Sequence, residues 1–397
     1  MAKDLVFYKG SRQRRNYWLI PFVILLALIT LAVVLFYGMQ KYAVITDEGV
    51  RVELPGSTSG DSMETASSAA ESVQGKLYMV TYPDIIFDAP DYSRVEATAG
   101  SRVPELRAAF VEAQDINYDK LMEVQASLID GNAMMLEMKP RSGQLVWNSQ
   151  TSIARNYSLN TDTDFANSLY TLIPDLKIRE DGKEVYLVAQ ISCFVDDLLA
   201  SRASQYALRT EYGANYTDEI GTWLDPYNAE VRNYVIDLAR ELYDMGFDEV
   251  VLADVMHPVV EAKQNANGEM EKATFVYSHE MSTQPNPITA ICGFAVYASE
   301  ELGDEEGRLS IYTDSARSLV RDDEATGQNA VLFMKIYDRV YYRTDKYTYS
   351  FNLQDMEGSV PVGKVNDRFV PVVINLIPHD NSSWVYINHE SSENTGG

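Results

Sequence analysis

The fold is decided by residues 225–258, which read DPYNAEVRNYVIDLARELYDMGFDEVVLADVMHP. Apolar residues recur at helical spacing from 228 to 245, so this stretch predicts an amphipathic helix. We expect Asp225 to cap the helix, Pro226 to occupy its first turn and Gly246 to end it. The apolar run at 250–255 then predicts a buried strand. A helix therefore leads directly into a strand that is buried on both faces.

The same alternation extends over residues 103–388. Apolar runs that predict strands lie at 106–111, 133–138, 185–194, 309–313, 331–336 and 368–377, and helical spacing recurs at 118–128, 165–176 and 288–302. Continuous apolar strands between helices are typical of a parallel sheet covered by helices. Length and strand number favour an α/β fold of the (β/α)8 TIM-like barrel type. An open doubly wound sheet is the alternative, although the sequence lacks the glycine-rich motifs of its nucleotide-binding versions.

The composition excludes several classes of function. The 397 residues carry 33 Lys and Arg against 58 Asp and Glu, a formal net charge of −25. Nucleic acid is therefore an unfavourable partner, because its phosphates are bound by Lys and Arg. The two cysteines, Cys193 and Cys292, exclude a disulfide scaffold and a cysteine-rich zinc module. His and Cys show no metal-binding spacing, so we expect neither a metal nor a cofactor.

The N-terminal segment is basic and then apolar. Residues 1–41 hold six bases and one acid, and residues 16–40 contain no charge. About 20 apolar residues cross a bilayer core, so residues 17–40 predict a transmembrane anchor. The bases before this span keep the N-terminus cytoplasmic. A cleaved signal peptide is the alternative, but the apolar stretch is longer than the roughly 7–15 residues typical of such peptides.

These patterns divide the chain into five parts. We expect a basic cytoplasmic head at 1–16, the anchor at 17–40, a juxtamembrane segment and flexible Ser-rich stalk at 41–102, the barrel at 103–388 and a disordered tail at 389–397. The protein is then a single-pass protein of the cell membrane, with the barrel on the extracytoplasmic side. The nearest polymer there is a cell-wall polysaccharide or another envelope glycan, which makes a glycan the expected partner by location.

Candidate functional residues follow from the rule that parallel barrels carry their sites at the carboxyl ends of the strands. Glu137, Lys139, Asp197, Asp254, His257, Asp314 and Asn375 stand at or just beyond such ends. Glycoside hydrolysis needs paired carboxylates, because one protonates the leaving oxygen while the other attacks or activates water. Glu137, Asp254 and Asp314 are therefore candidate catalytic residues. The alternative is that these acids are ordinary loop residues of a very acidic protein.

One block of the sequence resembles a known family. Residues 223–249, WLDPYNAEVRNYVIDLARELYDMGFDE, resemble the glycosyl hydrolase domain of bacterial surface proteins, whose pattern runs from W-x-N/D-P-Y to G-F-D-E. MLEMK at 135–139 with SGQLVW at 142–147, VYLVAQISCF at 185–194 and LS at 309–310 are similar to further motifs of that family. The resemblance implies a glycosidase-like TIM barrel.

Two of the three acids that the resemblance implies are displaced. The family's fourth-strand Asp falls on Ala253, one residue before Asp254. Successive strand side chains face opposite sides, so Asp254 is expected to point outward unless a bulge re-aims it. The fifth-strand Asp falls on Tyr312, and Asp314 lies two residues further on the same face. Glu137 keeps a carboxylate at the remaining position.

Three hypotheses follow from these departures. The favoured one is a surface-anchored barrel that binds cell-wall or another glycan, with reduced or lost hydrolytic activity. The second is an active glycoside hydrolase that uses Glu137 with Asp254 or Asp314. The third is a structural envelope protein that interacts with other proteins. In the first two, the substrate-binding candidates are Lys139, Asp197, His257, Tyr312 and Asn375.

Overall fold

The computed structural model describes residues 43–46, 49–52, 104–128, 130–264, 270–277, 287–303, 305, 307–315, 317–319, 322–344, 368–374 and 383–387. The chain forms two compact units, Met1–Glu71 and Ser72–Gly397. In the first unit, strands β1 (Ala43–Thr46) and β2 (Gly49–Val52) pair as an antiparallel hairpin. The second unit contains the barrel and the candidate site.

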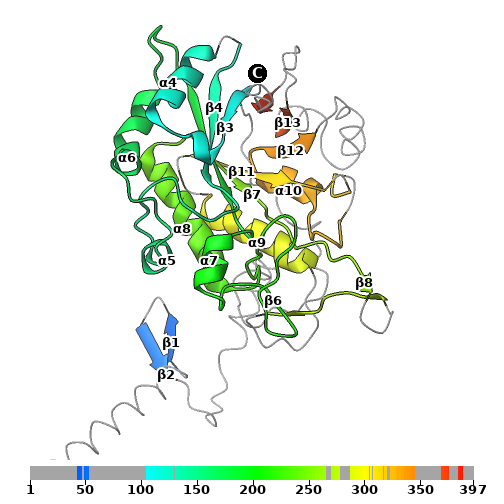
Figure 1. Cartoon of the computed structure of the whole chain (residues 1–397). Coiled ribbons are helices and arrows are strands. Elements are labelled where there is room, and N and C mark those ends of the chain that lie inside the picture. The colour runs from blue at the N-terminus through cyan, green and yellow to red at the C-terminus, as the bar shows by residue number, and fades with distance from the viewer. Residues whose placement is uncertain are drawn as a thin grey trace, which may run out of the picture. The chain divides into compact units, whose positions relative to one another are not determined.

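Eight parallel strands form a closed barrel in the second unit (Figure 1). Around the ring they are β3 (Arg107–Val111), β4 (Ala133–Lys139), β5 (Tyr186–Ser192), β7 (Glu249–Ala253), β11 (Arg308–Thr313), β12 (Val340–Thr344), β13 (Phe369–Ile374) and β14 (Trp384–Ile387). Every neighbouring pair is parallel. The expected TIM-like barrel is confirmed, and the open sheet is excluded.

The ring closes between the last and the first strand of the barrel. Trp384 N donates to Leu106 O over 2.7 Å, and Leu106 N donates to Ser383 Oγ over 3.0 Å. Leu106 and Ser383 are 277 residues apart in the sequence. The barrel is therefore complete only when both ends of this unit are in place.

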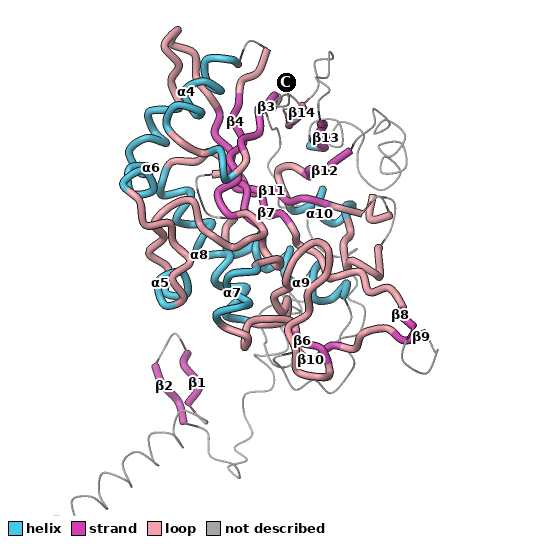
Figure 2. Tube along the Cα trace, viewed as in Figure 1, coloured by secondary structure: helices cyan, strands magenta, loops and turns pink. Residues whose placement is uncertain are grey.

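Helices alternate with the strands along the chain. They are α4 (Tyr118–Ser127), α5 (Ser152–Asn156), α6 (Asp164–Leu176), α7 (Asp197–Arg202), α8 (Ala229–Met245), α9 (Pro287–Glu301) and α10 (Ala330–Ile336). Figure 1 shows α4, α6 and α8 side by side outside the strands, and α6 contacts both α4 and α8. The 3-10 turn η2 (Ala113–Asp115) follows β3 in the chain. The small β6–β10 and β8–β9 ladders are separate from the ring (Figure 2).

Two local predictions from the sequence were wrong. The apolar run 331–336 forms helix α10 rather than a strand, because Asn329 caps it by accepting a hydrogen bond from Leu332 N over 2.9 Å. Helix α8 begins at Ala229 and is capped by Asn228, not by Asp225. The Asp225 carboxylate instead accepts from Tyr227 N over 2.9 Å, in the turn that precedes the helix.

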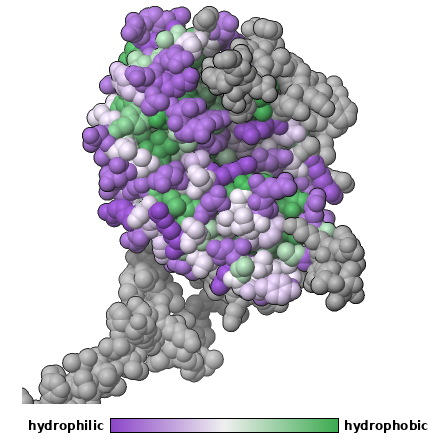
Figure 3. Space-filling model, viewed as in Figure 1, coloured by the Kyte–Doolittle hydropathy of each residue, from purple (hydrophilic) through white to green (hydrophobic). Residues whose placement is uncertain are grey.

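Alternate strand residues form two separate cores. Residues that point into the ring, including Met135, Val188 and Val251, form an inner cluster that fills the barrel. Their neighbours, such as Leu136 and Leu252, face outward and pack with the helices. This is the two-residue period of a strand buried on both faces. On the face shown in Figure 3 hydrophilic residues predominate, and apolar ones form small scattered groups.

Part of the predicted organisation falls on residues that the structure does not describe. The expected anchor at 17–40, the tail at 389–397 and most of the stalk at 41–102 lie outside the described residues. Among the helices that are described, none combines the length and apolar character needed to cross a membrane.

Candidate functional site

The three candidate catalytic acids line one cavity at the carboxyl end of the barrel. Glu137 comes from β4, and Asp254 and Asp314 follow β7 and β11 directly. The cavity has a volume of about 140 Å³, and its other lining residues are Arg141, Gln190, Ala253, Tyr312 and Arg343. Side chains from five strand ends or following loops thus converge where a barrel enzyme carries its site.

Asp254 reaches this cavity through its backbone conformation. Its φ angle is +53°, in the left-handed region, which few residues other than glycine adopt and which Asp tolerates better than most. Ala253, the residue before it, also lines the cavity. A regular strand would turn Asp254 to the opposite face, so the left-handed residue takes the role that a bulge was expected to play. The exception allowed in the sequence analysis thus applies: the backbone re-aims Asp254, which does not keep the outward orientation of a regular strand.

The Asp254 carboxylate is almost fully buried and firmly held. Arg141 Nη2 lies 2.6 Å from Oδ1, and Arg141 Nε lies 3.0 and 3.1 Å from Oδ1 and Oδ2. Ser192 Oγ donates to Oδ2 over 2.6 Å. These charge-assisted bonds suit a carboxylate that carries its negative charge.

The loop that carries Arg141 is fixed by the start of α7. Asp197 N donates to Arg141 O, and Leu198 N donates to Ser142 O, both over 3.1 Å. Gly143 follows with a φ of +84°, and a Cβ added there would lie 1.8 Å from an Asp196 carboxylate oxygen. Only glycine fits this close approach. The sequence analysis missed Arg141, although its place directly after Lys139 and Pro140 at a strand end was a usable signal.

The other two acids of the cavity hold protons more readily than usual. Burial raises the pKa of Asp314 to about 6, and the negative charge of Asp254 adds to the rise. Asp314 as a residue is nevertheless exposed, so the desolvation of its carboxyl is incomplete and water reaches it. Burial also raises the pKa of Glu137, although a hydrogen bond of 3.1 Å from Ala113 N opposes the rise. Two carboxyls with raised pKa values therefore share the cavity with the Asp254 carboxylate, which is paired with Arg141.

Tyr312 supplies the cavity with a hydroxyl group that has no hydrogen-bond partner among the described residues. The residue is 5% exposed, and its ring packs against Tyr341 with centroids 5.6 Å apart. Burial raises the pKa of Tyr312 above its ordinary value, so the group keeps its proton. A buried, unbonded hydroxyl is costly, and a ligand oxygen in the cavity would satisfy it.

Lys139 and Asp197, which were expected to bind substrate, make contacts within the protein. Lys139 is 1% exposed, forms a 2.9 Å ion pair with the buried Asp196 and donates to Ser192 O over 2.7 Å. Asp197 is exposed and accepts from Thr222 N over 2.7 Å, which holds the loop before Trp223. Neither residue lines the cavity of the three acids.

His257 does not line the cavity either. His257 is buried beside Phe275, and its ring nitrogens lie 3.1 Å from Pro258 O and 3.0 Å from the Tyr277 hydroxyl. Burial lowers the pKa of His257 to about 4. Asn375 lies outside the described residues, so its predicted role stays a prediction.

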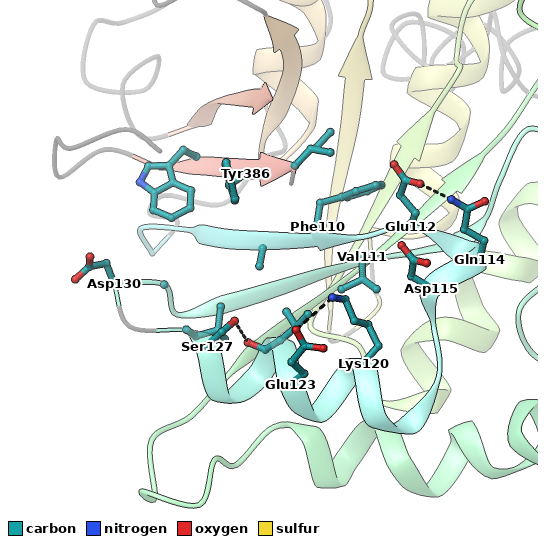
Figure 4. A pocket seen from close by; sticks show the side chains of 16 residues that line it. Phe110, Val111, Glu112, Gln114, Asp115, Lys120, Glu123, Ser127, Asp130 and Tyr386 are labelled. Atoms are coloured by element: carbon teal, nitrogen blue, oxygen red, sulfur yellow. Dashed lines mark hydrogen bonds and ion pairs between the residues drawn. The ribbon is translucent and has the colours of Figure 1, made fainter. Parts of the chain in front are cut away.

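A cavity larger than that of the three acids lies elsewhere, on the outside of the barrel. It has a volume of about 590 Å³ and is lined by α4, β3 and β14 (Figure 4). Three of its charged groups have partners: Lys120 lies 3.4 Å from Glu123, and Gln114 donates to Glu112 over 2.9 Å. None of the three candidate catalytic acids lines it. Position at the strand ends, rather than volume, therefore identifies the candidate active site.

Within the described part of the chain, no group of three or more His, Cys, Asp or Glu residues could hold a metal ion. The three acids of the cavity are accompanied by Arg141 and Arg343 instead. Guanidinium groups therefore supply the positive charges beside the three acids.

Comparison with known proteins gives one family match. Residues 108–343, more than half of the chain, match the family described as "Putative glycosyl hydrolase domain". A search of curated proteins finds no match.

Solved structures with similar folds include three bacterial and fungal proteins. A hypothetical protein of Ruminiclostridium thermocellum is 21% identical, with a TM-score of 0.41, 51% of this chain covered and 96% of that one. The PgaB (BpsB) glycoside hydrolase domain of Bordetella bronchiseptica is 14% identical, with a TM-score of 0.45 and coverages of 71% and 94%. Aspergillus fumigatus Ega3, solved in complex with galactosamine, is 10% identical, with a TM-score of 0.40 and coverages of 74% and 95%.

Proposed function

The chain belongs to the glycosyl hydrolase domain family matched over residues 108–343, and from this premise we propose that the barrel hydrolyses glycosidic bonds in a glycan. The observation that carries the proposal is the left-handed backbone at Asp254, which brings its carboxylate into one cavity with Glu137 and Asp314. Asp254 lies one residue after the position of the family's Asp, but its carboxylate still lines the cavity at the carboxyl end of the barrel. This favours an active enzyme over the binding-only hypothesis.

The environments of the carboxyls suggest their roles. Asp314, with a pKa raised to about 6, is protonated near neutral pH often enough to act as the general acid. Asp254, paired with Arg141, attacks the anomeric carbon or activates a water molecule. The Asp314 proton passes to the leaving oxygen as the C–O bond breaks. Water then supplies the new hydroxyl group and the proton that restores the acid.

Glu137 and Tyr312 have supporting roles in this proposal. Burial raises the pKa of Glu137, which favours proton exchange with the reacting oxygen beside it. The Tyr312 hydroxyl, which has no partner among the described residues, donates a hydrogen bond to the sugar. Both side chains line the same cavity.

The setting of the enzyme is also proposed. The uncharged, apolar residues 17–40 and the bases before them support an anchor in the cell membrane, with the barrel on the extracytoplasmic side. A glycan of the cell envelope is then the substrate within reach. Proteolysis of intact cells tests this arrangement: barrel fragments released from outside support it, whereas complete protection contradicts it.

Hydrolysis is tested with the full chain in detergent. Purified cell-wall glycans and aryl glycosides are the substrates, and released reducing ends are measured. Loss of a general acid costs about 10²–10⁴-fold in rate, so Asp314→Asn, Asp254→Asn and Glu137→Gln should all lower turnover, the first two by at least about 100-fold. Glu180→Gln, a change at an exposed loop residue outside the cavity, is the matched control.

Activity should fall as the pH rises above about 6, where Asp314 loses its proton. The anomer formed first, read by NMR, separates direct attack by Asp254 from attack by water. Equal turnover by the wild type and all three variants would overturn the proposal.

One observation favours a second function, glycan binding without hydrolysis. Arg141 and Ser192 together occupy both oxygens of Asp254, so the carboxylate must exchange partners before it can react. If the wild type releases no reducing ends yet stays bound to wall glycan, and Tyr312→Phe weakens that binding, the barrel is a glycan-binding module.

A further inference from the structure

A second cavity adjoins the small one and shares Glu137 with it. Its volume is about 430 Å³, and it is lined by Glu112, Ala113, Gln114, Ile116, Glu137, Pro140, Ser142, Gln144, Val146, Thr161, Thr163 and Phe165. We propose that this cavity, which we call the side cavity, holds the further sugar units of an uncharged oligosaccharide whose terminal bond is cleaved beside Glu137. This inference rests on the proposed hydrolysis and names the substrate class of the same site.

The volumes of the two cavities indicate whether the site binds a single sugar or a chain of several sugars. Pockets that hold small ligands measure about 300–1,000 Å³. The cavity with the three acids, at about 140 Å³, is below this range, whereas the side cavity, at about 430 Å³, is within it. The small cavity can therefore take the reacting group, but most of the ligand contact must come from next to it.

Glu137 is the junction between the two cavities. Its carboxylate lines both of them and accepts a hydrogen bond from Ala113 N over 3.1 Å. That bond fixes the turn η2, which forms one wall of the side cavity. A sugar chain lying in the side cavity thus reaches the acids at the same carboxylate that the proposed reaction uses.

The polar groups of the side cavity suit a ligand rich in hydroxyl groups. Thr161 Oγ1 donates to Leu145 O over 2.6 Å, and Gln144 Nε2 donates to Leu159 O over 2.8 Å. Each then has an oxygen left to accept a hydrogen bond. Thr163 Oγ1 accepts from Ala166 N, so its own proton is left to donate. Sugar hydroxyls both donate and accept, and can use all three groups.

The apolar part of the side cavity offers a surface for a sugar ring. Ile116 and Val146 are nearly buried, whereas Phe165, in the first turn of α6, is only partly buried. An aromatic face beside a few placed polar groups is the usual composition of a small-molecule site. Phe165 is therefore the residue whose removal should weaken binding most.

The charges of the side cavity exclude anionic chains. Among the described residues that line it, Glu112 and Glu137 are the charged ones, and none of these described residues is Lys or Arg. A phosphate or uronate group placed there would meet like charge without a cation to pair with. This selects uncharged sugars over anionic polymers.

The test uses a series of probes and two matched variants of the full chain. Uncharged oligosaccharides of one to six units from chitin, cellulose and mannan, and oligogalacturonates of the same lengths, are titrated by calorimetry. For at least one uncharged series, affinity should rise at least tenfold between one and three or four units. Phe165→Ala should reduce this affinity about tenfold, as expected for the loss of roughly 1.4 kcal/mol of contact.

Tyr170→Ala changes a more exposed aromatic residue of the same helix that lines neither cavity, and should bind as the wild type does. No gain in affinity with chain length, binding of the oligogalacturonates alone, or equal affinity of the two variants would each overturn the inference.

The two proposals fail in different ways. Binding is measured in Asp254→Asn, so it does not depend on turnover. Length-dependent binding with no turnover by the wild type would leave the side cavity valid and refute hydrolysis. If a simple aryl glycoside is hydrolysed but affinity does not rise with oligosaccharide length, hydrolysis is supported and the role of the side cavity is refuted.

Discussion

The buried pair of Lys139 and Asp196 allows a direct test of whether Lys139 serves the fold or the substrate. The two side chains are 1% and 0% exposed and 2.9 Å apart, and Lys139 also donates to Ser192 O. Removing one member of a buried ion pair costs about 3–5 kcal/mol, because the other charge is left without its partner. Lys139→Met should therefore lower the free energy of unfolding by that amount. A barrel of this size should lose roughly 2–4 °C of Tm per kcal/mol.

The assay is urea unfolding of the full chain, with Lys120→Met as the matched control. Lys120 forms an exposed pair with Glu123 at 3.4 Å, and exposed pairs contribute less than about 1 kcal/mol. A double-mutant cycle with Asp196→Asn should give a large coupling energy, because each single change already breaks the pair. The reasoning is refuted if Lys139→Met unfolds like Lys120→Met and yet loses glycan binding, since Lys139 would then serve the ligand.

Three further predictions follow from the same contacts. Gly143→Ala places a Cβ 1.8 Å from a carboxylate oxygen at a φ of +84°, and should lower the free energy of unfolding by more than about 2 kcal/mol. The control is Gly213→Ala, with a φ of +81° and no neighbour within 4 Å, which should lower it by only about 1 kcal/mol. Equal losses in urea unfolding would contradict the clash at Gly143. His257 has a pKa of about 4 when folded and an ordinary value of 6.5, so the unfolded chain binds its proton first as the pH falls. Up to about 3 kcal/mol of stability should be lost between these pH values, and His257→Phe should lose less over that range; an unchanged pH dependence would refute this. Arg343 lowers the pKa of Asp314, so Arg343→Met should move the fall in hydrolysis to higher pH, and a move to lower pH would contradict the acid role of Asp314.

The barrel was predictable where periodicity was long or strand runs were wholly apolar. The 17 residues of α8 and the strand after it needed no other information. The run that forms α10 has only seven residues, and a short apolar run fits a buried strand as well as a buried helix. The strands β12 and β14, with five and four residues, were missed because mixed sequences such as VYYRT and WVYI are too short to show a period.

The sequence predicted which strand ends carry the candidate site. It did not predict how the side chains there are oriented or which partners they contact. The strand-end rule identified Glu137, Asp254 and Asp314, which the structure brings into one cavity. Alternation along the strand left the face of Asp254 conditional on a local irregularity, because neighbouring side chains do not reveal a single left-handed residue. Arg141 was missed because its partner lies 113 residues away.

The closure of the ring between β14 and β3 has a consequence for how the chain matures. Strand β3 lacks one of its two neighbours until Ser383 and Trp384 have been synthesised, because the bonds of Leu106 to these residues span almost the whole unit. Such distant pairing forms late and slowly. During translation the open edge of β3 can pair with another nascent chain. The first strand of this fold is therefore the one most exposed to wrong pairing. It needs protection from other nascent chains until the rest of the barrel has been synthesised.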